Sequence, residues 1–234
     1  MNVYKYFIEL IDPIFYSKEG LSAATTPSYL HATAVNHAVA YGLGKGINQP
    51  YIISEENGGR NVPRYESSQI CPDFYFTPAR IDGNITYQPQ IVKGDADGFL
   101  NKGGPAEVLR SSTLYFLSPE SKFIGYVFTR KEMAFPKIIR LGSFRGKAKL
   151  KLSEVRVYKE ISEAFVSHPV DPLVNDVLRG VMVNMFPYPI VENSYCRNCI
   201  IIKEGRSERI VSMPQNYEIT SMDILSTSSN TMVF

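Results

Sequence analysis

The sequence has no long apolar run and few cysteines, and each shortage excludes a class of protein. No stretch approaches the roughly 18 to 20 consecutive apolar residues of a membrane-crossing helix. Residues 1–12 lack the basic region, apolar run and cleavage site of a secretion signal. The three cysteines, Cys71, Cys196 and Cys199, are too few for a disulfide framework in 234 residues. We therefore expect a cytoplasmic protein with free thiols.

The motifs of common metal sites and hydrolases are also missing. Cys196 and Cys199 have the spacing of half a zinc site, but a closed site needs four ligands and no second pair of closely spaced Cys or His follows. There is no Walker loop, no HExxH pair and no nucleophile motif near His168. Asp95 and Asp97 lack the downstream glutamate of a calcium loop. We expect no metal and no cofactor, and two dispensable thiols at a turn between strands.

The charge of the chain is nearly balanced overall but unevenly distributed. Its formal net charge is +2, which by itself predicts no polyanionic partner. Residues 130–159 contain ten basic and two acidic residues, so this segment carries +8 and the remainder carries −6. Such a basic band is typical of a protein that holds a nucleic-acid backbone at one place. The basic residues are Arg130, Lys131, Lys137, Arg140, Arg145, Lys147, Lys149, Lys151, Arg156 and Lys159, and the acidic ones are Glu132 and Glu154.

Two segments carry helix signals. Thr26 and Pro27 offer a cap and a first-turn proline, and apolar residues then recur at helical spacing, so we expect a helix over residues 27–41. Asp171 and Pro172 repeat this signal and predict a second helix over residues 172–183.

The rest of the chain favours strands and loops. Residues 3–11 are aromatic and β-branched and predict a core strand, whereas residues 47–105 are dense in Gly, Pro and Asn. We expect a hairpin of residues 113–117 and 123–129, further strands at 138–139, from 147 onward, at 199–203 and at 209–212, and a fraying tail at 226–234. This order predicts one α+β domain over residues 1–234. It should be ferredoxin-like (RRM-like), an antiparallel sheet with helices on one face and long inserted loops around residues 45–105.

A row of alternating lysines is the most informative pattern. Lys147, Lys149 and Lys151 alternate with apolar residues, so a period of two places three ammonium groups on one face of a strand. The row spans about 13 Å. Successive phosphates of an extended single strand lie at comparable distances, so the row can follow a nucleic-acid backbone.

A short loop precedes this row. Glycine permits a positive φ and lets a phosphate approach backbone N–H groups. Arginine offers forked donors to phosphate, and a phenylalanine ring can carry an unstacked base. Alternating lysines can instead only solvate an outer face or protect a sheet edge, but the loop favours RNA binding. The candidate site comprises Arg140, Gly142, Ser143, Phe144, Arg145, Gly146, Lys147, Lys149 and Lys151.

Residues 140–148 (RLGSFRGKA), residues 31–44 (HATAVNHAVAYGLG) and the opening strand resemble the type I-D CRISPR Cascade subunit that caps the 5′ handle of crRNA. The resemblance covers most of the chain. It implies a RAMP-superfamily fold and a non-catalytic, RNA-binding role in antiviral defence. It also implies contacts with the backbone filament subunit and the large subunit, and leaves contact with target DNA near the recognition motif open. The glycine-rich loop of RAMP proteins usually lies later in the chain and is denser in glycine, so assigning phosphate contacts to residues 142–146 is a hypothesis about position as well as role.

Two other functions compete with this interpretation. Related RAMP proteins cut RNA without metal, using a histidine near the first helix, and His31 or His37 could act in this way. Six residues correspond to about 240° of rotation around a helix, so the two histidines cannot act as a pair. A protein-interaction subunit without RNA contact would explain the acidic remainder and the long loops, but not the concentration of +8 in one segment. We therefore expect a scaffold and not an enzyme.

Overall fold

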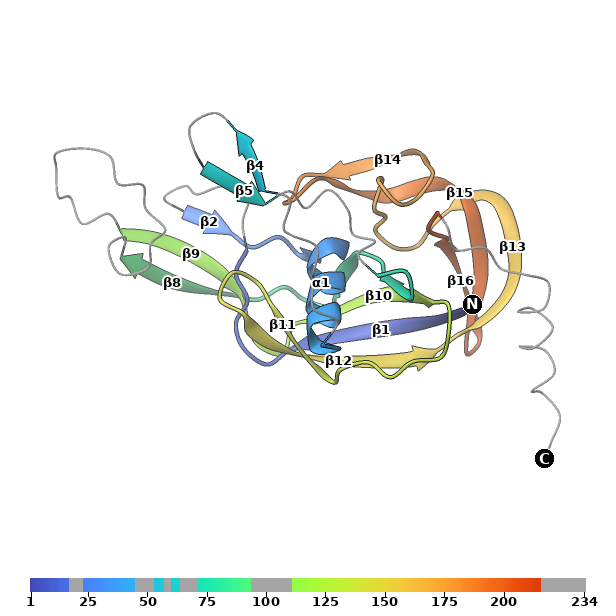
Figure 1. Ribbon diagram of the computed structural model, residues 1–234, viewed down its shortest axis with the longest axis horizontal. Coiled ribbons are helices and arrows are strands. Elements are labelled where there is room, and N and C mark those ends of the chain that lie inside the picture. Colours follow the sequence, from blue (N-terminus) through green and yellow to red (C-terminus); the bar gives the residue numbers. More distant parts are fainter. Residues whose placement is uncertain (17–22, 45–52, 57–59, 64–70, 94–110, 216–234) are drawn as a thin grey trace.

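The fold is mostly antiparallel sheet (Figure 1). A computed structural model describes residues 1–16, 23–44, 53–56, 60–63, 71–93 and 111–215, and α1 (Ala32–Gly42) is the one α-helix among them. The main sheet has seven strands in the order β11-β12-β1-β10-β7-β3, with β6 also paired to β10. These strands are β1 (Asn2–Leu10), β3 (Tyr29–Leu30), β6 (Phe74–Phe76), β7 (Ala79–Asp82), β10 (Lys122–Thr129), β11 (Ile138–Leu141) and β12 (Gly146–Glu154).

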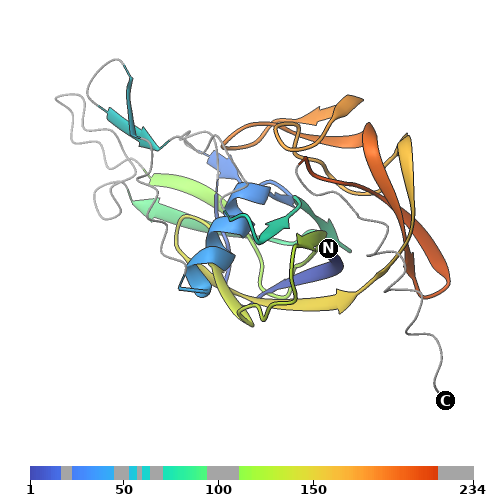
Figure 2. The same cartoon turned by 45° about the vertical axis from the view of Figure 1, so that its right-hand side comes forward.

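A second sheet rises from one end of the main sheet, so that the body is a curled half-barrel (Figures 1 and 2). Its strands are β13 (Arg156–Phe165), β14 (Val177–Val183), β15 (Ile190–Glu204) and β16 (Ser207–Ser212). β15 is central, because β13, β14 and β16 all pair with it. Two smaller sheets consist of β2 (Ala23–Thr25), β8 (Tyr87–Lys93) and β9 (Ser111–Leu117), and of β4 (Ile53–Glu56) and β5 (Arg60–Pro63).

Helix α1 covers one face of the main sheet. Tyr6, Ile8 and Leu10 alternate along β1 and are buried in one cluster with Val35 and Val39 of the helix. The side chain of Asn36 bonds the backbone N–H and C=O of Phe76, at 2.9 and 2.8 Å, and so joins the helix to β6. Because each buried aliphatic or aromatic side chain stabilises the fold by about 1.5 to 3 kcal/mol, this apolar contact fixes which face of the sheet the helix occupies.

The opposite face of the main sheet packs against the second sheet at one end. Val3, Tyr126 and Phe128 are buried there with Ile200 and Ile202. A polar contact accompanies this core: the Nζ of Lys5 lies 2.7 Å from Oε2 of Glu204, and the hydroxyl of Tyr126 donates to Oε1 of Glu204 at 3.0 Å. Burial, and the neighbouring Glu204 carboxylate, raise the pKa of the Tyr126 hydroxyl. The second sheet thus covers only part of this face.

The first predicted helix is confirmed, and the second is wrong. Helix α1 begins after His31, whose Nδ1 accepts from the N–H of Thr33 at 3.1 Å, so the helix starts later than the predicted residue 27. Over residues 172–183 the chain forms a turn and then β14. The side chain of Asp171 does accept from the N–H of Leu173, at 3.0 Å, but it caps only this turn. An Asx turn and a helix cap share this local bond, and the β-branched residues that follow favour a strand.

Several predicted strands are confirmed but are paired differently. β9 and β10 were expected to form a hairpin, yet β9 pairs with β2 and β8, while β10 belongs to the main sheet. Cys196 and Cys199 lie inside β15 and are fully buried, so their prediction at a turn is wrong. Because α1 is the one helix that the described residues place on the main sheet, the expected ferredoxin-like set of helices on one face is not found among them. Residues 226–234, Asp95 and Asp97 lie outside the described residues. Within the described ranges, no helix is long and apolar enough to cross a membrane.

His168 is a buried polar group in the second sheet's core region. Its Nε2 accepts from the N–H of Ser212 at 3.1 Å, which places the proton of the neutral ring on Nδ1, 2.8 Å from the carbonyl oxygen of Pro169. Burial lowers the pKa of His168 to about 4. Burial likewise lowers the pKa of His31 to about 4. Both rings are therefore neutral in the folded protein at pH values where an unfolded histidine, with a pKa of about 6.5, is charged.

We expect the free energy of unfolding to fall as the pH drops from 7 to 5. The unfolded state binds protons at these two histidines below pH 6.5, whereas the folded state does not, so each should contribute a loss of about 2 kcal/mol by pH 5. Urea unfolding of the wild type and of His168→Gln at both pH values measures this. The variant should keep the part of the loss that comes from His31 and from His37, whose pKa burial also lowers, so at least about half should remain, and an unchanged loss would contradict the assignment.

Candidate nucleic-acid interface

The three lysines of β12 share an exposed face of the main sheet. Lys147, Lys149 and Lys151 are exposed, while Ala148 and Leu150 between them are buried in the cluster that contains the helix. Since successive side chains of a strand point to opposite faces, the ammonium groups lie on the face opposite to α1. The predicted alternation is confirmed, and the row lies on the same face as the second sheet but outside the area that this sheet covers.

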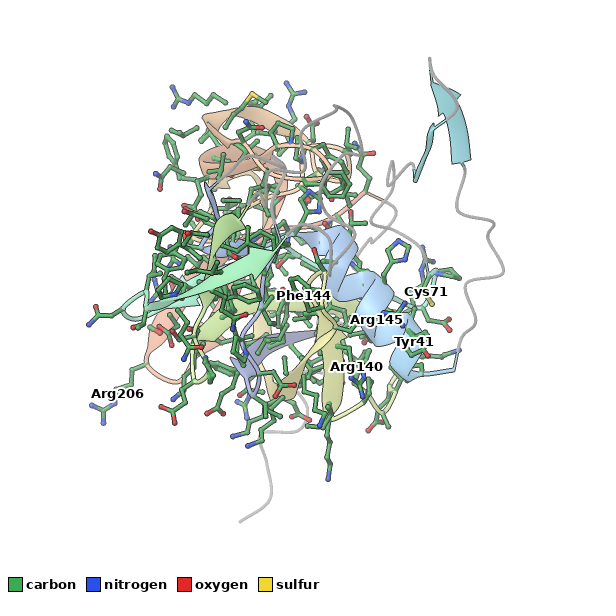
Figure 3. All side chains as sticks on the ribbon, turned by 90° about the vertical axis from the view of Figure 1, so that its left-hand side faces the viewer. Tyr41, Cys71, Arg140, Phe144, Arg145 and Arg206 are labelled. Carbon is green, nitrogen blue, oxygen red and sulfur yellow. The ribbon has the colours of Figure 1, made fainter. Side chains whose placement is uncertain are left out.

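Strand β11, which pairs with β12, adds an arginine beside Lys147 at one end of the lysine row. Arg140 on β11 lies directly opposite Lys147 on β12. Opposite residues have Cβ atoms about 4.5 to 5.5 Å apart, and like charges at this position destabilise a sheet. The guanidinium of Arg140 also donates to the carbonyl oxygen of Arg145, at 3.3 Å. Arg140, Phe144 and Arg145 lie near one another on one side of the molecule (Figure 3). A bound anion here would remove the repulsion between Arg140 and Lys147.

The two glycines of the loop are required by packing within the protein. Gly142 has φ +75°, and a Cβ there would lie 2.7 Å from Cγ2 of Ile14 and 2.8 Å from the carbonyl oxygen of Phe15. A Cβ on Gly146 would lie 3.0 Å from the carbonyl oxygen of Pro13. The predicted reason for these glycines, close approach of a phosphate, is therefore replaced by close approach of residues 13–15.

Three backbone N–H groups in and directly after the loop are already engaged. The N–H of Ser143 donates to the carbonyl oxygen of Phe15 at 2.8 Å, and that of Arg145 donates to Gly142 at 3.1 Å. The N–H of Lys147 donates to a carboxylate oxygen of Asp12 at 3.0 Å. These bonds fix the loop against the preceding chain. Any grip on a phosphate at this place must therefore come mainly from the side chains of the arginines and lysines.

The ring of Phe144 packs on two other phenylalanine rings. Its ring stacks on Phe116 with centroids 5.5 Å apart and an interplanar angle of 27°, and its centroid is 6.2 Å from that of Phe15. The side chain remains 44% exposed. The ring is held in place by its neighbours and still presents surface to solvent, so little conformational entropy would be lost if a base packed on it.

Phe7 is a candidate that the sequence did not reveal. It lies on β1 directly opposite Lys151 on β12 and opposite Ile124 on β10, so it belongs to the lysine face. The ring is half-buried, and the Nζ of Lys5 lies 5.4 Å from its centroid. Apart from Lys5 and Glu9, this part of β1 is apolar or aromatic. The sequence therefore shows no alternation of polar and apolar residues that would place Phe7 and Tyr6 on different faces. Only the pairing with β12 identifies its face.

Three other cations of the basic band lie elsewhere. Arg156 and Lys159 belong to β13 in the second sheet, and Lys131 forms an ion pair with Asp73 at 3.2 Å. The structure thus divides the band and leaves Arg140, Arg145 and the three lysines together. Among the described residues, none of these five forms an ion pair with a carboxylate.

A cleft of about 770 Å³ lies where β12 passes into β13. Its charged lining residues are of both signs, with Glu132 and Glu154 alongside Arg156 and Lys203. Burial, and then the carboxylates of Glu154 and Glu132, raise the pKa of the Tyr4 hydroxyl in this lining. The cleft has two carboxylates against two cations, whereas the three lysines of the row have one carboxylate, Glu9, opposite Lys149 on the neighbouring strand, so the row is the better phosphate site.

The histidines of α1 lie across the main sheet from the lysine row. His31 is 2% exposed and caps the helix, and His37 is half-buried, with its pKa lowered by burial. Since α1 packs on the opposite face, neither ring is placed beside the lysines. In the part of the chain that the structure describes, no group of three or more His, Cys, Asp or Glu is arranged to hold a metal ion.

Comparison with solved structures finds distant similarity. One chain, from a cryo-EM structure described as type III-B Cmr-beta bound to cognate target RNA and AMPPnP, is 11% identical, with a TM-score of 0.46. A second, from the complex described as bound to cognate target RNA, is 10% identical, with a TM-score of 0.43. Each similarity covers 82% of this chain and 86% of the other. A comparison with curated proteins finds no match.

Comparison with protein families gives a match over nearly the whole chain. The family described as type I-D CRISPR-associated protein Cas5/Csc1 matches residues 1–221. This confirms, at the level of the family, the resemblance carried by residues 31–44 and 140–148. The chain belongs to the type I-D Cas5/Csc1 family of CRISPR-associated proteins.

Proposed function

We propose that this protein is a non-catalytic RNA-binding subunit of a type I-D Cascade complex, that it holds the 5′ handle of the crRNA, and that it caps the backbone filament beside the large subunit. The observation that carries the proposal is a group of five cations, with Arg140, Lys147, Lys149 and Lys151 on the open part of the main sheet and Arg145 in the turn between β11 and β12. Membership of the family supplies the link to a CRISPR effector and its guide RNA.

The arrangement suits a backbone held without base-specific contacts. The lysine row spans about 13 Å along one strand, which allows successive phosphates to meet successive ammonium groups. At one end, Arg140 and Arg145 add planar donors that can bind a phosphate in a bidentate manner. Phe144 and Phe7 lie beside the cations and offer rings for bases or riboses, as aromatic residues on RRM-type sheets do.

Unpaired like charges supply a second argument for an anionic ligand. Arg140 and Lys147 lie opposite each other, and no described carboxylate pairs with either of them. In contrast, Lys5 forms an ion pair with Glu204 at 2.7 Å, and Arg197 lies 3.1 Å from Glu163. A ligand with regularly spaced negative charges would compensate the cations that the protein itself leaves uncompensated.

The positions of the histidines support a binding role over cleavage. Metal-independent cleavage needs a general base within hydrogen-bond reach of the ribose 2′-hydroxyl. His31 is buried as a helix cap, and His37 lies on the helix side of the main sheet, away from the proposed RNA path. The alternative function, a crRNA-processing endoribonuclease that uses His31 or His37, would require the RNA to lie against α1.

We expect no cleavage of precursor guide RNA by the purified chain in the presence of a metal chelator. Denaturing gels of labelled precursor RNA, with wild type and with His37→Ala, provide the measurement. Cleavage by the wild type that disappears in His37→Ala would favour the endoribonuclease. His31→Ala is less informative, because loss of the cap also destabilises α1.

Replacing Lys147, Lys149 and Lys151 together by Ala should weaken binding of single-stranded RNA strongly at low salt. Each phosphate contact removed should reduce the slope of log K against log salt by roughly 0.7, so the triple variant should lose about two units of slope. Fluorescence anisotropy with a short labelled RNA at several salt concentrations gives both quantities.

A matched control is available on the second sheet. The triple variant Lys159→Ala, Arg206→Ala and Arg209→Ala removes the same charge from exposed positions. Arg206 lies well apart from Arg140 and Arg145 (Figure 3). Equal losses of affinity and slope in both triple variants would mean that the lysine row has no special part in binding.

Phe144→Ala should weaken RNA binding by about 1 to 3 kcal/mol with an almost unchanged salt slope, because stacking releases no counterions. Phe144→Leu keeps apolar contact with Phe116 and removes the flat ring, so it separates stacking from support of the loop. The Leu variant should lose affinity while its melting temperature stays near that of the wild type. Wild-type RNA affinity in Phe144→Leu would show that the ring serves only to pack the loop.

A further inference from the structure

A row of side chains crosses the main sheet from the last lysine of β12. Lys151 lies opposite Phe7 on β1. Phe7 lies opposite Ile124 on β10, and Ile124 lies opposite Arg80 on β7. Because directly opposite residues of antiparallel strands share a face, all four belong to the lysine face. We call this set, Lys151, Phe7, Ile124 and Arg80, the Phe7 row.

Arg80 points away from α1, into solvent. Ala79 and Ile81, on either side of it, pack in the buried cluster that contains the helix. Successive side chains of a strand alternate between faces, which confirms that Arg80 lies on the lysine face. It is exposed, as is Lys151, whereas Phe7 and Ile124 are half-buried. The row therefore has a cation at each end and two apolar side chains between them.

The charge of Arg80 is only partly compensated. Among the described residues, no carboxylate lies in ion-pair range of its guanidinium. Tyr29 on β3 lies opposite Arg80; burial and the carboxylate of Glu192 raise the pKa of its hydroxyl, and Arg80 lowers it. Burial lowers the pKa of His168, and Arg80 lowers it further. Arg80 thus lies at the border with the second sheet, where Glu192 weakens its charge without pairing with it.

An RNA strand on the lysine row would meet a less favourable surface if it continued along β12. The next residue of β12 on this face is Ser153, opposite Lys5, whose ammonium group is already paired with Glu204 at 2.7 Å. The cleft that follows has two carboxylates among its charged lining residues. A phosphate therefore finds no uncompensated cation at Ser153 and mixed charges beyond it.

The row next to the Phe7 row is electrically balanced. Lys149 and Lys122 alternate there with Glu9 and Asp82 across the four strands. A carboxylate beside each ammonium group weakens the attraction of that row for a phosphate. The Phe7 row contains two cations and no carboxylate, so of the paths that leave the lysines it suits a polyanion best.

We propose that the RNA turns at Lys151 and crosses the main sheet along the Phe7 row, so that Arg80 binds a backbone phosphate at the far end. Three steps between neighbouring strands separate β12 from β7, about 14 Å in all, which is close to the span of the three lysines. Bases or riboses of the crossing nucleotides pack on Phe7 and Ile124. The inference rests on the proposed binding of RNA to the lysine row, and adds a binding residue and the direction of the strand.

Arg80→Gln and Arg156→Gln form a matched pair that distinguishes the two paths. Each removes one positive charge from an exposed arginine, and Arg156 lines the cleft on the straight path. Fluorescence anisotropy with a single-stranded RNA of about ten nucleotides measures affinity at several salt concentrations. Arg80→Gln should bind about three- to tenfold more weakly at low salt and lose about 0.7 of the salt slope. Arg156→Gln should match the wild type in both.

Photo-cross-linking gives a second measurement that removes no charge. A photo-reactive residue at position 124 should cross-link to the bound RNA, because Ile124 lies in the middle of the Phe7 row. The same residue at position 155 should not, although Val155 is also half-buried and lines the cleft. Melting temperatures near that of the wild type show that both substituted chains are folded.

The outcomes separate the crossing from the proposed function. Wild-type affinity and slope in Arg80→Gln, with weak binding by the triple lysine variant, would leave RNA on the lysine row and overturn the crossing alone. A loss in Arg156→Gln, with cross-links from position 155 and none from 124, would assign the straight path. Cross-links from position 124 to protein only, in the assembled complex, would mean that a partner subunit covers the Phe7 row. Wild-type binding by the triple lysine variant would overturn both proposals.

Discussion

The packing of Tyr6 against Gly125 sets the arrangement on which the other contacts depend. Tyr6 lies on β1 opposite Gly125 on β10, and a Cβ at residue 125 would come within 2.6 Å of three atoms of the Tyr6 side chain. The buried hydroxyl of Tyr6 donates to the carbonyl oxygen of Thr77 at 2.6 Å. A slip of one residue would turn every side chain of β1 to the other face. Because β12 pairs with β1, this register also determines which face carries the lysines.

The two faces of the main sheet consequently have different surroundings. The Tyr6 face is covered by α1 and is apolar, whereas the Phe7 face is shared between the second sheet and the lysine row. At the shared boundary, Glu204 pairs with Lys5 and accepts from Tyr126. Its carboxylate compensates the cation nearest the second sheet. Further along, where the sheet is open, Arg140 and Lys147 lie opposite each other, and the one carboxylate opposite a lysine of the row is Glu9, which faces Lys149.

The sequence predicted the elements whose pattern is local. The alternation from Lys147 to Leu152 was sufficient, because a period of two is visible without knowledge of the partner strands, and α1 followed from apolar spacing. The helix predicted after Asp171 was wrong, because a capped turn and a capped helix share the same first hydrogen bond. Only the pairing with β15 shows that residues 177–183 are extended. The place of Phe7 in the candidate site depends on pairing with β12, a contact between residues more than 140 positions apart.

The glycines of the loop illustrate the same limit at the level of a single residue. A glycine between arginines and lysines suggested access for a phosphate, but residues 13–15 occupy that space. Access to the backbone and packing of a neighbouring segment both require the absence of a Cβ, so the residue type alone cannot distinguish them. The loop's role in binding, as proposed, therefore belongs to the side chains that the packed glycines hold in place.

The lysine row and the second sheet are mechanically connected. β12 carries the lysines and continues after Glu154 into β13, the strand that pairs with one side of β15. On the other side of β15 lies β14, and the buried cluster of Val3, Phe128 and Ile202 joins the two sheets. Well-packed interiors transmit displacement with little deformation. Any partner bound to the second sheet would thus be held in a fixed orientation relative to the lysine row, so that a cap lacking base-specific contacts could still place the RNA end at a defined position in the complex.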